Sequence, residues 1–167
     1  ADVTRVVTRP GRGKQNFLDT FPPLLWTFEY IEPGGRAEMA IVIRDANGDA
    51  PEDVERQLAG ALTGKRLPPF HYGIRFHATR RETETWLLAD IAAINRVAAR
   101  YEGSNVVPIP GPLEDITAAK EQFIRLLTSA GLPNVPEVVR EITREIDLAV
   151  LRLHCPRFRD FEVKVRS

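Results

Sequence analysis

The stretch that most constrains the fold is a short apolar run followed by an acidic turn. Residues 39–43 are all apolar, the next turn reads Asp45-Ala46-Asn47-Gly48-Asp49, and residue 51 opens an amphipathic segment. An apolar run this short, set between turn residues and a helix start, predicts a strand buried on both faces. Such strands belong to parallel sheets covered by helices, in which ligands bind at the carboxyl ends of the strands.

Three polar side chains follow this expected strand: Asp45, Asn47 and Asp49. Oxygen ligands clustered at a strand end suit a hard cation such as Mg2+, so the pattern predicts a metal site there. Two plainer interpretations stand beside it. Asn-Gly is a common hairpin turn, and Asp49 is well placed to cap the following helix. Asp45 ends the strand directly, where a capping role is less available.

The composition limits the class of protein. A chain of 167 residues is long enough for one domain with a sizeable core. Its 23 basic and 23 acidic residues cancel, which argues against a strongly basic nucleic-acid module. The single cysteine, Cys155, excludes an internal disulfide and favours a reducing compartment, which we take to be the cytoplasm. No apolar run approaches the length of a membrane span, so no membrane association is expected.

Hydrophobic periodicity predicts alternating strands and helices first, and helices afterwards. Strands are expected over residues 2–8, 39–43 and 71–78. Helices are expected over residues 15–31, 51–64, 80–100, 115–130 and 135–153, with Pro22-Pro23 breaking or restarting the first and Cys155-Pro156 ending the last. This order predicts a three-layer α/β fold with a small parallel sheet and a mainly helical C-terminal cover over residues 114–167.

A basic loop over residues 9–14 follows the first expected strand. It lacks the Walker spacing, because Gln15 rather than Ser or Thr follows Lys14, so a nucleotide-binding P-loop is not expected. Arg12 and Lys14 are candidates for contacts with phosphates, and a solvated loop is the equally weighted alternative.

A second acidic candidate lies in the helical pattern over residues 80–100. Its apolar stripe runs through Leu87, Leu88, Ile91 and Ile94, and extending the stripe backwards reaches Glu84. A carboxylate in line with a core-facing stripe is costly unless it is paired or binds a cation. We therefore expect Glu84 to serve a metal or catalysis, with a buried salt bridge to Arg75 or Arg81 as the alternative. Glu82 lies on the other side of the helix and is expected to face solvent.

Four stretches carry a family resemblance: residues 43–49, residues 81–90 with their Glu-x-Trp-Leu-Leu run ending in Asp, residues 112–120, and Cys155-Pro156-Arg157-Phe158-Arg159-Asp160-Phe161. The chain resembles a Toprim-like family of unknown function, related to the nuclease domain of the overcoming-lysogenisation-defect proteins. Toprim is the metal-binding fold shared by topoisomerases, primases and those nucleases. The resemblance implies one Toprim-like domain over residues 1–167.

This resemblance implies a divalent metal, Mg2+ or Mn2+, held by acidic side chains, and phosphodiester chemistry. In the Toprim pattern an Asp-x-Asp pair follows the central strand, and here Asn47 stands where the second Asp would be, two residues after Asp45. The lost charge implies weaker metal binding, which Asp49 is expected to offset. The family pattern also begins with a strand ending in glutamate; no such segment precedes residue 2, so this strand is expected to be upstream or absent.

The resulting expectation is a metal-dependent, nuclease-like domain acting on DNA or RNA, together with an ATPase partner. Asp45 and Glu84 are its candidate catalytic residues, Asp45, Asn47, Asp49 and Glu84 its metal ligands, and Arg12, Lys14 and Lys120 its contacts with the nucleic-acid backbone. For Lys120 an exposed helix lysine is the plainer interpretation. Asn47 and the missing glutamate favour a non-catalytic module that binds a partner protein or nucleic acid. A third, weaker interpretation is a small-molecule phosphohydrolase.

Overall fold

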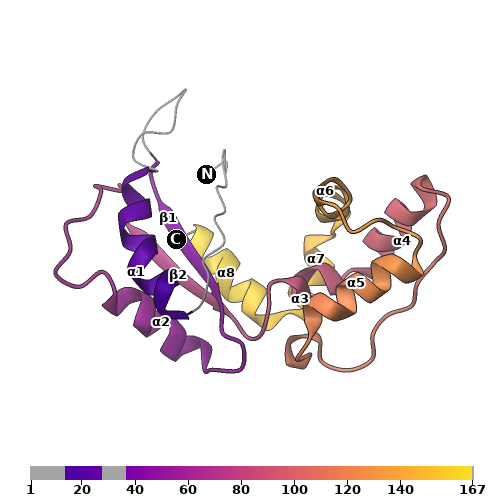
Figure 1. Ribbon diagram of the computed structural model, residues 1–167, viewed down its shortest axis with the longest axis horizontal. Helices are drawn as coiled ribbons and strands as arrows, with labels where there is room; N and C mark the ends of the chain where they lie inside the picture. Colours follow the sequence, from indigo (N-terminus) through magenta and orange to yellow (C-terminus); the bar gives the residue numbers. More distant parts are fainter. Residues whose placement is uncertain (1–13, 28–36, 167) are drawn as a thin grey trace. The chain divides into compact units, whose positions relative to one another are not determined.

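The computed structural model describes residues 14–27 and 37–166, with side chains from residue 17 onward. The expected strand over residues 2–8 and Arg12 lie outside this part, as does the side chain of Lys14, although its backbone begins the first helix. The elements, drawn in Figure 1, are α1 (Lys14–Thr27), β1 (Ala40–Asp45), α2 (Pro51–Gly60), β2 (Ile74–Thr79), α3 (Glu84–Leu88), α4 (Ile91–Arg100), a 3-10 helix (Leu113–Asp115), α5 (Ala119–Ser129), α6 (Pro136–Glu145), α7 (Leu148–His154) and α8 (Pro156–Arg166).

These described residues fall into two compact units. The sheet unit contains the described residues up to 44, residues 50–78 and residues 163–166, whereas the helical unit contains residues 45–49 and 79–162. The last residue of each strand, Asp45 in β1 and Thr79 in β2, therefore belongs to the helical unit.

Within the described part of the chain, β1 and β2 form a two-stranded sheet with helix α2 as the crossover between them (Figure 1). The strands are parallel, because Ala40 N bonds Gly73 O and Ala46 N bonds Thr79 O at the same offset along the chain. A mixed α/β fold with a small parallel sheet and a majority of helices is thus confirmed.

On the side of β2 that faces away from β1, side chains form hydrogen bonds with the main-chain groups of the strand. Glu55 of α2 accepts a hydrogen bond from Ala78 N through Oε1 (3.0 Å), and Lys164 of α8 donates to Phe76 O through Nζ (2.8 Å). The same two side chains form an ion pair, with Lys164 Nζ 2.7 Å from Glu55 Oε2. Main-chain groups on this side of the strand therefore have polar partners from two helices.

The helical unit has one continuous apolar core. It includes the expected inward positions Leu88, Ile91 and Ile94, together with Leu127 and Ile142. The aromatic ring of Trp86 packs on the edge of this core against two phenylalanines of α8. The stripe expected through Leu88, Ile91 and Ile94 is thus confirmed as a buried face, whereas Leu87 is only partly buried.

Several expected boundaries are wrong. The helix expected over residues 80–100 is divided into α3 and α4, because the Asp90 side chain accepts from Ala93 N and so caps a new helix. Asp147, which accepts from Ala149 N, likewise divides the helix expected over residues 135–153. Cys155-Pro156 ends a helix as expected, but Pro156 also starts α8, where a first-turn proline loses no helical hydrogen bond.

Two further expectations about local structure fail. Helix α1 continues through Pro22-Pro23, although each proline removes one helical N–H, and Phe21 and Leu25 on either side of the pair are buried. Strand β1 is not buried on both faces: Val42 is buried, but Ile43 is 38% exposed. An unbroken apolar run does not by itself report which face of a strand is covered.

Candidate functional site

Asp45 occupies the carboxyl end of β1, in the helical unit. One carboxylate oxygen, Oδ1, accepts hydrogen bonds from the Thr79 hydroxyl (3.0 Å) and from the backbone N–H of Thr83 (3.0 Å). Thr79 ends β2, and Thr83 precedes helix α3. Since the strands are parallel, both ends meet at one edge of the sheet, as the sequence predicts for a ligand site. Oδ2 has no hydrogen-bond partner among the residues that the structure describes.

The turn after Asp45 has the geometry of a tight hairpin turn, yet it leads into a helix. Asn47 and Gly48 both have positive φ, at 52° and 97°, and Asp49 N bonds Ala46 O (3.0 Å). Two positive φ angles in a row are the reason for the Asn-Gly pair. The N-cap position of α2 is Ala50, so Asp49 does not occupy it. Asn47 and Asp49 are both exposed on this turn.

Glu84 is the first residue of α3 and is partly buried. Its Oε2 lies 3.4 Å from the hydroxyl of Thr83, the residue whose N–H bonds Asp45. Within the described residues Glu84 forms no ion pair with Arg75 or Arg81, so the alternative of a buried salt bridge is not met there. Asp45 and Glu84 are thus linked through one threonine.

Burial and nearby charges raise the pKa of the Asp45 carboxyl group above its ordinary value. Burial is the largest cause, and the negative charges of Glu84 and Glu82 act in the same direction. The hydrogen bonds from Thr79 and Thr83 oppose the shift but do not cancel it. Two other carboxyl groups, those of Glu84 and Glu82, therefore lie within electrostatic reach of Asp45.

Glu82 is not solvent-facing, contrary to expectation. It is partly buried, and its Oε2 accepts a hydrogen bond from the backbone N–H of Lys120 (2.9 Å) in the first turn of α5. A carboxylate at a helix N-terminus satisfies an open donor and complements the helix dipole. Lys120 itself is an exposed helix residue, and its observed link to the site is through its backbone.

Arg81 lies directly against the acidic turn. Its Nη1 is 2.6 Å from where a Cβ on Gly48 would lie, and its carbonyl oxygen accepts from Asn47 N (3.2 Å). Among the described residues its guanidinium forms no ion pair with an acid. Gly48 is therefore favoured for its positive φ, whereas a Cβ there would displace only the flexible end of the arginine side chain.

The remaining stretches that carry the resemblance join the same unit through another buried acid. Glu114 accepts from Arg157 N at the start of α8 (2.9 Å), and burial is the main cause that raises the pKa of its carboxyl group. The neighbouring Cys155 thiol is also buried, which raises its pKa to about 12. Sequence reasoning missed Thr79, Thr83 and Glu114 as partners. The one local signal is the hydroxyl residue Thr79 at the end of β2, whereas the contact of Glu114 joins residues 43 positions apart.

The donor set fits a divalent metal only in part. In the part of the chain that the structure describes, no three His, Cys, Asp or Glu side chains are grouped closely enough to hold an ion by themselves. Mg2+, however, is usually bound by one or two carboxylates together with waters and substrate phosphates. Asp45 Oδ2, with Glu84 nearby and no described cation beside it, fits that sparser arrangement.

Three comparisons with known proteins complete this description. No curated protein matches the chain, and no solved structure matches it. In the described residues, no helix has the length and apolar character needed to cross a bilayer. One family model matches residues 11–166, which is nearly the whole sequence. The chain therefore belongs to the family described as a domain of unknown function, DUF4276.

Proposed function

We propose that this protein is a Toprim-like, Mg2+- or Mn2+-dependent phosphodiesterase that cleaves DNA or RNA, working with an ATPase partner. The observation that carries the proposal is the environment of Asp45. This carboxylate is partly buried at the carboxyl end of two parallel strands, with two other acids raising its pKa. A partly buried carboxylate without a cationic partner is costly for folding, and acids with perturbed pKa values cluster at functional sites.

The proposed work of the residues follows from their contacts. Thr79 and Thr83 fix one oxygen of Asp45, which leaves the other oxygen oriented for a ligand. Asp45 and Glu84 would hold the metal, with Asn47 and Asp49 contributing from the turn. The bound metal supplies charge neutralisation for a phosphate and orientation for an attacking water. Glu82, engaged at the start of α5, positions the loop that carries Glu84.

A second candidate is a non-catalytic module that binds nucleic acid or a partner protein through the same fold. The exposed amide of Asn47, where the Toprim pattern has an acid, favours this alternative, because it removes a charged ligand. A site with fewer carboxylates binds divalent metals more weakly. The two candidates differ in one measurable respect, which is turnover of a phosphodiester bond.

The test is a plasmid and single-strand cleavage assay of the full chain with Mg2+ and with Mn2+. We expect cleavage by the wild type, and a loss of at least about 100-fold in Asp45→Asn and Glu84→Gln, the scale seen when one preorganised charged group is removed. Glu137→Gln, an exposed acid in α6, is the matched control and keeps activity. Thermal melts show whether each variant is folded.

Three results separate the candidates. Equal cleavage by wild type and Asp45→Asn contradicts the assignment of the site. Strand binding without cleavage by any preparation supports the non-catalytic module. Hydrolysis of mononucleotides but not of polymers favours the small-molecule phosphohydrolase.

A further inference from the structure

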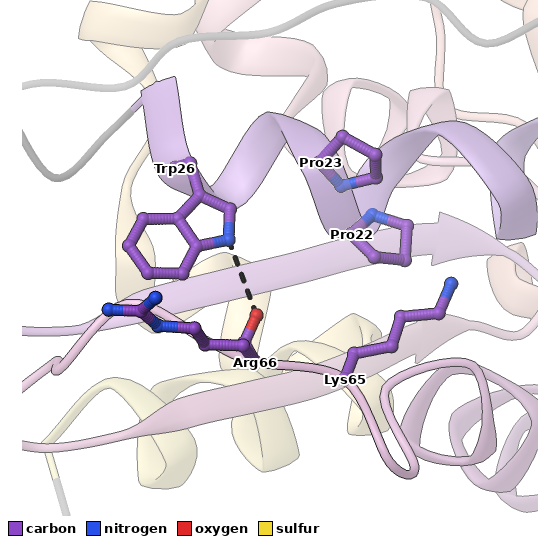
Figure 2. Close-up of a pocket in the computed structure, with 5 residues that line it drawn as sticks. All are labelled: Pro22, Pro23, Trp26, Lys65 and Arg66. Carbon is purple, nitrogen blue, oxygen red and sulfur yellow. Dashed lines mark hydrogen bonds between the residues drawn. The ribbon is translucent and has the colours of Figure 1, made fainter.

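A small opening in the sheet unit is formed by α1 and the loop that follows α2. Its volume is about 260 Å3, and it is lined by Pro22, Pro23, Trp26, Lys65 and Arg66 (Figure 2). Two prolines and an indole make an apolar surface, and two cations lie beside it. No carboxylate contributes to this lining.

The aromatic wall is held in place by the loop opposite it. The Trp26 indole N–H donates to Arg66 O (3.3 Å), drawn as the dashed line in Figure 2. The guanidinium carbon of Arg66 lies 5.7 Å from the centre of the same ring, within cation–π range. The ring and one cation are therefore ordered before any ligand binds, which lowers the entropy cost of binding.

The two cations are available to an anion. Lys65 and Arg66 are both exposed, and neither forms an ion pair with an acid among the described residues. In Figure 2 their side chains run in opposite directions from adjacent loop positions, that of Arg66 beside the Trp26 ring and that of Lys65 toward Pro22. Two adjacent positive charges without acidic partners attract a ligand that carries negative charge along its length.

We propose that this opening binds one nucleotide unit of a single-stranded nucleic acid, with the phosphates on its two sides at Lys65 and Arg66 and its base against Trp26. Sites for single strands combine a positive groove with aromatic rings that contact bases. The volume is below the roughly 300–1,000 Å3 of complete small-ligand pockets, which suits one unit of a longer chain. The inference rests on the proposed function only in choosing nucleic acid over other polyanions.

The experiment is fluorescence anisotropy of a labelled oligothymidylate, titrated with the full chain in EDTA so that cleavage plays no part. Lys65→Gln/Arg66→Gln is expected to weaken binding at least tenfold. It should also make the slope of log K against log salt less negative by about 1.4, because each single-strand phosphate contact contributes about 0.7. Trp26→Leu should weaken binding at least about fivefold, and Trp26→Phe, which keeps an aromatic face, much less.

The matched control is Arg125→Gln/Arg140→Gln. It removes the same two charges from exposed residues that form no ion pair with described acids. An equal loss of affinity in this control overturns the proposal, because only bulk charge would then matter. Equal competition by oligoglutamate also overturns it, in favour of an acidic peptide. Strand binding that depends on Trp26, Lys65 and Arg66 but is accompanied by no cleavage in Mg2+ or Mn2+ supports this site while the proposed catalysis fails.

Discussion

The contact between the ends of α4 and α5 allows a sharp test of packing in the helical unit. After α4, Glu102 has a φ of 56° and Gly103 N bonds Ala98 O (2.9 Å), which is the Schellman arrangement. The next residue, Ser104, donates its N–H to Ala130 O beyond the end of α5 (3.1 Å). The two helix ends therefore meet backbone to backbone at Gly103.

Replacing Gly103 by alanine should disrupt this meeting point. A Cβ there would lie 2.1 Å from Ala130 O and 3.3 Å from Ala98 O, whereas ordinary Cβ contacts begin near 3.4 Å. Both obstacles are backbone atoms, so one helix end must move by roughly an ångström. Overpacking of this kind costs about 1–3 kcal/mol. Stretching the Ser104–Ala130 hydrogen bond costs about 1 kcal/mol more.

Part of this loss is offset, because alanine restricts the unfolded chain and so stabilises by about 0.4–1 kcal/mol. The expected net destabilisation is about 2 kcal/mol, or a fall in Tm of roughly 4–8 °C for a chain of this size. Urea unfolding followed by circular dichroism measures it. Gly60→Ala is the control: it ends α2 with nothing within 4 Å of the new Cβ, and it should be neutral or slightly stabilising. Equal midpoints for the two variants would refute the packing argument.

Three further predictions concern acids and the thiol. Folding raises the pKa of Asp45, so the folded state binds the proton of this carboxyl group more tightly than the unfolded state does. The stability gained in this way is fully present below the pKa of the unfolded state, about 3.9, and is lost as the pH rises through the pKa of the folded state. Without divalent metal, Asp45→Asn should therefore melt higher than wild type at pH 7, and the gap should close in acid. Asp90→Ala should cost about 1–2 kcal/mol in urea unfolding, since it removes the side-chain cap of α4 and the acceptor of the Asp147 N–H. Cys155, with a pKa of about 12, should react with iodoacetamide in the native protein only at the rate of unfolding, measured by mass spectrometry.

The sequence predicted the parts of the fold that depend on local pattern. The stripe through Leu88, Ile91 and Ile94 is buried, and the apolar run before Asp45 is a strand of a parallel sheet. Helix starts at Asp90 and Asp147 were missed, because an aspartate inside an apolar stripe was not weighed as a cap. Aspartate is a preferred N-cap residue, but the continuous apolar stripe predicts one unbroken helix at both positions.

The candidate site was predicted less completely. The position of Asp45 at a strand end follows from local pattern, and Glu84 lies close enough to affect the pKa of Asp45. The bond from Thr79 and the engagement of Glu82 by α5 join residues 34 and 38 positions apart. Such pairings depend on how elements dock, and a one-dimensional period carries no information about them.

The acids that complete helix starts in the helical unit have a consequence for how it folds. Glu82 accepts a hydrogen bond from the start of α5, 38 residues away, and Glu114 accepts one from the start of α8, 43 residues away. Asp90 accepts one from the backbone N–H of Asp147, 57 residues away. Each helix thus gains its terminal acceptor only when a remote segment has already docked, so the helices gain little stability alone. Formation should be all-or-none and slow for a largely helical protein, and an excised helix pair from this unit should remain mostly unstructured.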